Sequence, residues 1–285
     1  MRATEPRSLS ALGILGAMIQ NIASPGCVQV DMQNRSEIRE SFKFLVLASA
    51  VTLVLWFIPF AELLTYPFRI FVTYIHETGH AIAAFATLTG VNSMNIDWNG
   101  NGQVMTTSGN ILISSAGYLG SLVYGSGLLL LLRQARHART MAIATASAML
   151  IAPIIFGGTL NTWIFGILLG GGLMALALKA ASRLTHFFMS FLAIQCILNA
   201  FYDLRTVMFL SAFNPGTHTD AQNMSAHTGL PAVFWAVVWT LISLVILVYT
   251  LKIYYRSIKQ RAESSAAPGV ALLDEPMRKT ADPWG

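Results

Sequence analysis

The sequence predicts an all-α polytopic membrane protein of about six to seven transmembrane helices, with a short β-hairpin after the second of them. The chain has 285 residues, of which 54% are hydrophobic and only 11% are charged, whereas soluble domains carry about a quarter charged residues. Apolar runs long enough to cross a hydrocarbon core of about 30 Å recur along the chain. One polar interval between two of them contains the turn signal Asn99-Gly100-Asn101-Gly102.

The apolar runs define seven candidate spans, at approximately 43–61, 67–88, 111–132, 140–156, 160–180, 185–207 and 230–254. Only Gly157-Gly158 separates the fourth from the fifth. We therefore expect one membrane domain over residues 42–256, with an N-terminal segment at 1–41 and a polar, disordered tail at 257–285. Its partner is the lipid bilayer, and a bacterial chain of this kind belongs in the cell (inner) membrane.

The N-terminal segment favours an interfacial amphipathic helix, because leucine and isoleucine recur at helical spacing from Leu9 to Ile22. A cleaved signal peptide is the alternative, since Arg2 and Arg7 precede an apolar stretch that ends near Ala23. The net charge of +5 comes mostly from basic residues flanking the spans. That pattern reports membrane orientation, and the sequence indicates no nucleic-acid partner.

The second candidate span contains His76-Glu77-Thr78-Gly79-His80. Residues four apart share one face of a helix, so the two histidines can bind one zinc ion. Glu77 then lies where a carboxylate can act as a general base toward water. Two histidines and a carboxylate in hydrocarbon are costly unless something binds them, which favours a Zn²⁺ site over a chance motif.

A catalytic zinc ion takes three protein ligands and keeps one open position. Asp203 is the predicted third ligand, because it lies near the end of an otherwise apolar span and intramembrane acids are functional by default. Asn199 is four residues back on the same face, where it can contact a ligand or the substrate. Two alternatives stay open: Asp220, in a polar loop, and His186, at the start of the sixth span.

The interval between the second and third spans predicts a β-hairpin, since Met94, Ile96 and Val104 alternate with polar residues around the turn. It is either an ordinary water-exposed loop or an edge strand that binds an unwound substrate, with these three residues in contact with it. In the third span, Gly117 and Gly120 predict close packing against the helix with the histidines.

Together these segments resemble the site-2-protease class of intramembrane zinc metallopeptidases (peptidase family M50), and most closely its compact M50B-like branch, which has no inserted recognition domain. The resemblance extends from about Tyr66 to Tyr254. It rests on these motifs: His76-Glu77-Thr78-Gly79-His80-Ala81, the hairpin, Ser115-Ala116-Gly117-Tyr118-Leu119-Gly120, Tyr202-Asp203-Leu204, Thr219-Asp220-Ala221 and Gly229-Leu230-Pro231-Ala232.

The resemblance implies zinc ligation by His76, His80 and Asp203, with Glu77 as general base. The implied activity is hydrolysis of peptide bonds in membrane-anchored protein substrates, as in regulated intramembrane proteolysis. One departure from better-known members is Leu204, which follows Asp203 where they carry glycine. The resemblance also implies a hairpin on the cytosolic side, whereas the distribution of basic residues indicates the opposite side. The alternative function is a catalytically silent membrane protein or an ion transporter that retains the metal site.

Overall fold

In a computed structural model, the described residues are 61–265 apart from residue 215, together with isolated residues between 43 and 54. The chain divides into two units, one formed by 1–40 with 257–285 and the other by 41–256. The fold and site below belong to the second unit. The predicted N-terminal helix, most of the predicted span at 43–61 and the tail beyond Ser265 lie outside the described residues.

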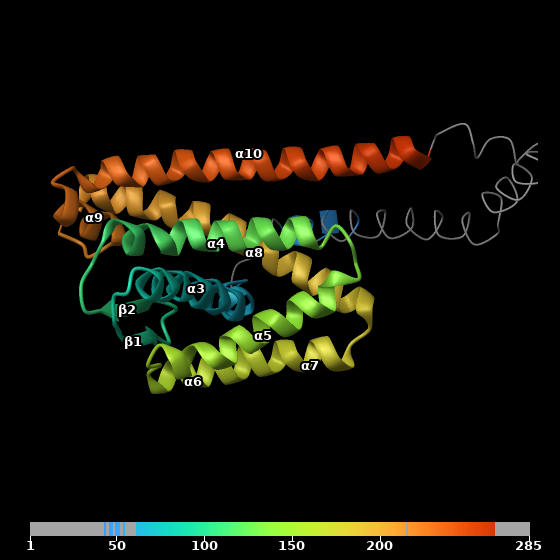
Figure 1. The fold of residues 1–285 in the computed structure, drawn as a ribbon, viewed down its shortest axis with the longest axis horizontal. Helices are drawn as coiled ribbons and strands as arrows, with labels where there is room; N and C mark the ends of the chain where they lie inside the picture. Colours follow the sequence, from blue (N-terminus) through green and yellow to red (C-terminus); the bar gives the residue numbers. More distant parts are fainter. Residues whose placement is uncertain are drawn as a thin grey trace, which may run out of the picture. The chain divides into compact units, whose positions relative to one another are not determined.

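The fold is all-α with one two-stranded hairpin, which confirms the predicted class (Figure 1). In chain order the described elements are α3 (Ala61–Ala86), β1 (Val91–Ile96), β2 (Gly102–Thr106), α4 (Ile111–Leu131), α5 (His137–Ile155), α6 (Leu160–Phe165), the π-helical turn η1 (Gly166–Gly170), α7 (Gly171–Lys179), α8 (Ser182–Phe213), α9 (Asp220–Thr228) and α10 (Ala232–Ser265).

Within the described residues, five helical segments are long and apolar enough to cross a membrane. They are α4, α5, the continuous segment α6–η1–α7, α8, and α10 as far as Ser257. Each coincides with one of the predicted spans. The sixth long helix, α3, carries the histidine motif and packs against α4 and α8, so it lies among membrane-spanning neighbours. The chain is therefore an integral membrane protein with several spans.

The break between the fourth and fifth predicted spans is present at the two glycines. Gly157 has φ +65°, which a residue with a side chain rarely adopts. A Cβ at this position would also lie 3.0 Å from the carbonyl oxygen of Asn92 in β1. This glycine therefore lets the α5–α6 turn approach the hairpin backbone closely.

The hairpin runs back along α3, so its turn lies beside the middle of that helix. Antiparallel pairing joins β1 to β2, with Ile96 opposite Gly102 and Val91 opposite Thr106. Three α3 side chains hold the carbonyl oxygens of the turn: the Tyr66 hydroxyl donates to Trp98 (2.6 Å), Arg69 Nη2 to Asn99 (2.6 Å) and the Thr73 hydroxyl to Gly100 (2.9 Å). Because a helix rises about 1.5 Å per residue, the turn contacts α3 about 20–30 Å back from the end of that helix.

At its other end, the hairpin meets α4. The Asn110 side chain caps α4 by accepting from the Ile113 backbone N–H (2.8 Å) and donates to the Thr87 hydroxyl (3.0 Å) just after α3. The C-terminal end of α3 and the N-terminal end of α4 therefore lie together at the base of the hairpin. The strands thus lie alongside α3 (Figure 1).

The outer side of β1 is covered by α6 and the turn before it. The Thr162 hydroxyl donates to the Met94 carbonyl (2.9 Å) and accepts from the Ile96 backbone N–H (3.0 Å). The Met94 backbone N–H also donates to the Gly157 carbonyl oxygen (3.3 Å). These bonds satisfy backbone groups that no water could reach. Among the described residues, β2 has no strand partner besides β1.

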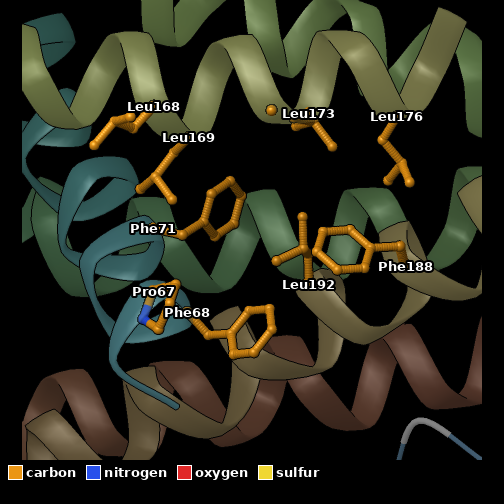
Figure 2. Close-up of a pocket in the computed structure, with 10 residues that line it drawn as sticks. Pro67, Phe68, Phe71, Leu168, Leu169, Leu173, Leu176, Phe188 and Leu192 are labelled. Atoms are coloured by element: carbon orange, nitrogen blue, oxygen red, sulfur yellow. The ribbon is translucent and has the colours of Figure 1, made fainter. Parts of the chain in front are cut away.

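An apolar cavity of about 310 Å³ lies between α3, α7 and α8. Figure 2 shows Phe68 and Phe71 from α3 facing Leu173 from α7 and Phe188 and Leu192 from α8 across it. Its lining offers no carboxylate or imidazole, so this cavity has no group for metal chemistry. The motif residues His76, Glu77 and His80 lie further along α3.

Candidate metal centre and active site

The two motif histidines share one face of α3, as their spacing predicts. Their Nε2 atoms are 3.0 Å apart, and their rings meet edge to face with centroids at 4.8 Å. His80 is buried, whereas His76 is half-buried. Both rings therefore direct a nitrogen toward the same point, as two ligands of one ion require.

A carboxylate from α9 completes this group. Asp220 is the first residue of α9, and Thr219 caps that helix by accepting from the Gln222 backbone N–H (3.2 Å). Asp220 Oδ2 lies 3.4 Å from His76 Nε2 and 3.3 Å from His80 Nε2. The three donor atoms form a compact triangle, and in the described part of the chain they are the group suited to hold a metal ion.

The dimensions of this triangle fit a tetrahedral zinc ion. Ligand atoms bound at about 2.0–2.1 Å in a tetrahedron lie about 3.3 Å from one another. The separations of 3.0, 3.3 and 3.4 Å match that value without rearrangement. Two imidazoles and one carboxylate also leave one position open, which is the arrangement of catalytic zinc sites.

A hydrogen bond selects the tautomer of His80 that can bind a metal. His80 Nδ1 lies 2.6 Å from the carbonyl oxygen of Ile113 at the start of α4. A carbonyl oxygen can only accept, so Nδ1 carries the proton and donates. In the neutral ring, Nε2 then holds a free lone pair, and it points at the donor triangle.

The surroundings of Asp220 favour its ionised form, the form in which a carboxylate can bind a metal. Burial alone would raise the pKa of this carboxyl group, but the charge of His80 when its ring is protonated, together with hydrogen bonds from both imidazoles, outweighs burial and holds the pKa well below its usual range in the metal-free site. Asp220 lies on a short helix outside the candidate membrane spans. The carboxylate is therefore available as an anionic donor across the physiological pH range.

Small residues on α4 make room for the ligand nitrogens. A Cβ on Gly117 would lie 2.5 Å from His76 Cε1 and would also meet the Nε2 atoms of both histidines. A Cβ on Gly79 would lie 2.5 Å from the Ala116 carbonyl oxygen. The predicted close packing of α4 against the histidine helix is therefore confirmed.

Glu77 lies between the donor triangle and the hairpin. It is buried, with 5% of its surface exposed, and it is close enough to His80, His76 and Asp220 for their charges to act on it. A Cβ on Gly102, the first residue of β2, would lie 2.5 Å from Glu77 Oε1. The carboxylate is thus held next to both the donor triangle and the strand that leads away from it.

The model of one protein family, described as Peptidase M50B-like, matches residues 45–250 of this sequence. The chain belongs to this family. No match was found among curated proteins or among solved structures. Membership of a peptidase family agrees with the resemblance drawn from the motifs. In this M50B-like chain the match covers α3, the hairpin, α4 and α9, the elements that carry the site.

The structure groups Asp220, and not the predicted third ligand Asp203, with the two histidines. Asp203, half-buried on α8, is close enough to His76 for the imidazole to act on its charge, but it is not one of the three grouped donors. Asp220, one of the two open alternatives, takes that place. His186, the other, lies near the start of α8 with Nε2 2.9 Å from the Leu132 carbonyl oxygen.

The candidate substrate-binding residues are also placed differently from the prediction. Met94 and Ile96 are fully buried with no exposed surface, because β1 turns these side chains into the core. Val104 is half-buried and packs against the same core. Asn199 donates its amide to the Gln195 carbonyl oxygen of its own helix (2.9 Å). The exposed side chains of β2 are instead those of Gln103 and Met105.

Proposed function

We propose that this M50B-like protein is a zinc-dependent intramembrane endopeptidase that hydrolyses peptide bonds of membrane-anchored proteins. His76, His80 and Asp220 hold the zinc ion. The observation that carries the proposal is the donor triangle, whose edges fit tetrahedral zinc and whose third member comes from a separate helix. Asp220 thus replaces Asp203 as the proposed third ligand. Asp203 lies beside the site as a second carboxylate.

Glu77 is the proposed general base. A bound zinc ion would supply Lewis-acid chemistry, lowering the pKa of a coordinated water and polarising the scissile carbonyl. The Glu77 carboxylate accepts a proton from the attacking water and returns it to the nitrogen of the leaving amine. Its burial beside the donor triangle and Gly102 keeps this carboxylate in one place for both transfers.

The free edge of β2 is the proposed substrate platform. A transmembrane helix shields its own backbone, so a substrate must unwind before its peptide bond can be cut. Strand addition to β2 would replace the lost helical hydrogen bonds. Two observations support this edge: β1 is already covered by α6, and β2 begins against Glu77.

A catalytically silent protein or an ion transporter would also need the ligand triangle, so the triangle alone does not separate these functions. Glu77 does. Ion binding by His76, His80 and Asp220 leaves no task for Glu77 as a fourth side chain. A carboxylate that is buried next to this triangle is costly unless it handles protons during a reaction.

Metal content tests the ligand set. We expect purified protein in detergent to bind about one zinc ion per chain, and His76→Ala, His80→Ala and Asp220→Ala to lose it. Asp203→Ala is the matched control on α8 and should retain zinc. Full zinc retention in Asp220→Ala, with loss in Asp203→Ala, would return the third-ligand role to Asp203.

Cleavage tests the reaction. A panel of single-span peptides with a fluorophore and quencher should be cut by the parent protein and not by Glu77→Gln, while zinc content stays at the parent level. Proteolysis by Glu77→Gln at the parent rate would remove Glu77 from the mechanism. Zinc binding by the parent with no cleavage of any peptide in natural-lipid vesicles would favour the silent or transporter alternative.

A further inference from the structure

The apolar cavity between α3, α7 and α8 has the length and the lining of a site for a hydrocarbon chain. It follows the helix from Leu168 to Leu176, a length of about 12 Å at about 1.5 Å per residue. One leaflet of a hydrocarbon core of about 30 Å is about 15 Å deep. The side chains that line the cavity are those of leucine, phenylalanine, proline and glycine residues (Figure 2). In depth and in polarity, the cavity therefore matches a segment of an acyl chain.

The cavity opens on the surface of the helix bundle. Leu168 lines it and is 62% exposed, and Gly172, which also lines it, is exposed as well. Both residues belong to the segment α6–η1–α7, which is long and apolar enough to cross a membrane, so this surface faces lipid. The π-helical turn η1 supplies Leu168 and Leu169 to the lining, and such turns are frequent at functional sites.

Basic side chains lie just beyond one end of the cavity. Leu176 and Phe188 line this end (Figure 2). Lys179 is the last residue of α7, one helical turn after Leu176, and Arg183 is in the first turn of α8, about 7.5 Å along the helix before Phe188. Arg139 of α5 joins them, because its Nη2 donates to the backbone carbonyl oxygen of the residue after Lys179 (3.2 Å). All three basic side chains are exposed.

No carboxylate balances these three charges in the described part of the chain. The ion pairs found there join Asp220 to the two motif histidines, and none involves Lys179, Arg183 or Arg139. α8 also begins without a side-chain cap, so the backbone N–H groups of its first turn add to the attraction for an anion. The phosphate of an anionic lipid complements this end of the cavity in charge.

We propose that the cavity and the basic residues at its end bind one anionic phospholipid. An acyl chain lies between α3, α7 and α8, and the phosphate lies at Lys179, Arg183 and Arg139. Basic pockets between transmembrane helices bind anionic headgroups in this way. The bound chain also contacts α3, the helix with the two histidines, at Phe68 and Phe71. Binding of this lipid does not require the metal site.

Lipid selectivity tests the headgroup contact. In native mass spectrometry, we expect the purified protein to bind about one phosphatidylglycerol per chain and to bind phosphatidylcholine with the same acyl chains more weakly. Lys179→Gln combined with Arg183→Gln should weaken phosphatidylglycerol binding about 20–30-fold, which is about fivefold for each charge. Arg205→Gln, toward the other end of α8, is the matched control and should bind like the parent protein. Equal affinities of the parent protein for the two lipids would overturn the proposal.

Gly172→Phe tests the cavity, because Gly172 lines it and no atom lies within 4 Å of the Cβ that the substitution adds. The new ring has room to occupy the cavity and exclude the acyl chain, so the affinity for phosphatidylglycerol should fall at least about tenfold. Gly171→Phe is the matched control, since its added Cβ is equally free of contacts and Gly171 is not among the lining residues. Equal affinity of the two variants would contradict the placement of the chain.

Thermal unfolding separates loss of the site from loss of the fold. Added phosphatidylglycerol should raise the unfolding temperature of the parent protein and of Gly171→Phe, and should leave that of Gly172→Phe unchanged. If Gly172→Phe does not fold, the selectivity between the two lipids and the variant without Lys179 and Arg183 still decide. A single-span peptide that binds the parent protein and not Gly172→Phe, while phosphatidylglycerol does not bind, would overturn the lipid and assign the cavity to a transmembrane helix.

Discussion

Gly117→Ala would test whether the donor triangle is a metal site, because the added methyl group would occupy the space beside the ligand nitrogens. The new Cβ would lie 2.5 Å from His76 Cε1 and meet both Nε2 atoms, whereas ordinary contacts of a Cβ begin near 3.4 Å. Relief therefore requires that the imidazoles or the α4 backbone move by about 1 Å, on the order of the displacement that costs a catalytic site 100-fold.

The backbone cannot absorb this shift easily. On the facing helix, Gly79 packs against α4 so closely that its own Cβ would lie 2.5 Å from the Ala116 carbonyl oxygen. The imidazoles must therefore move, and His80 would lose its 2.6 Å contact with the Ile113 carbonyl oxygen. Metal sites tolerate errors of only about 0.2 Å in ligand distance. We expect zinc affinity to fall at least about 100-fold in Gly117→Ala.

Gly127→Ala on the same helix is the matched control, since no atom lies within 4 Å of the Cβ it would add. Alanine favours a helix over glycine by about 0.5–1 kcal/mol, so this variant should unfold at the same or a higher temperature and bind zinc like the parent. Chelator competition for zinc and a thermal unfolding curve of each metal-free protein give both quantities. If Gly117→Ala bound zinc as tightly as Gly127→Ala, the ligand geometry described above would be wrong.

Three further predictions concern the base, the hairpin and the metal. Gly102→Ala should lower the cleavage rate about 100-fold with zinc retained, because the added methyl displaces the Glu77 carboxylate; wild-type cleavage would contradict this. Thr162→Val removes the hydroxyl that serves the Met94 carbonyl and the Ile96 N–H, and should lower the free energy of unfolding by about 1–3 kcal/mol in denaturant titrations; an unchanged midpoint would argue that water replaces it. Zinc at 100-fold its dissociation constant should raise the free energy of unfolding by about 2.7 kcal/mol and slow hydrogen exchange in α9, and chelation should reverse both effects. Hydrogen exchange in α9 that does not change with zinc would mean that this helix carries no ligand.

The local parts of this structure could be predicted from the sequence because their signals are local. The spans follow from apolar length, and the histidine pair follows from helical spacing. The Asn99-Gly100 turn identified the hairpin, although its position beside α3 depends on Tyr66, Arg69 and Thr73, whose hydrogen-bond partners lie about 30 residues further along the chain. Periodicity holds no information about such partners.

The carboxylate that lies with the two histidines, Asp220, was only an alternative in the sequence-based prediction, for the same reason. Asp203 sits in an apolar span, where an acid is costly, whereas Asp220 sits in a polar stretch, where an acid is ordinarily solvated. In the sequence, the cost of each acidic side chain can be judged only from the polarity of its neighbours along the chain. In the structure this polar stretch forms α9, and its Ala221 packs into the apolar cluster that contains Tyr118 and Trp239. The available local signal was the Thr219-Asp220 pair, a helix start that aims a carboxylate at whatever α9 packs against.

The division of α3 into two faces explains how this helix could both hold a metal and present a base to an extended substrate. His76 and His80 face α4 and α9, where Gly117 leaves room for them. Thr73 and Glu77, four residues apart, face the hairpin at Gly100 and Gly102. Because consecutive residues 76 and 77 lie about 100° apart around a helix, one turn of α3 serves both partners. The two proposed histidine ligands and the proposed base are thereby held on one helix, and a substrate strand paired with β2 would reach Glu77 without any domain movement.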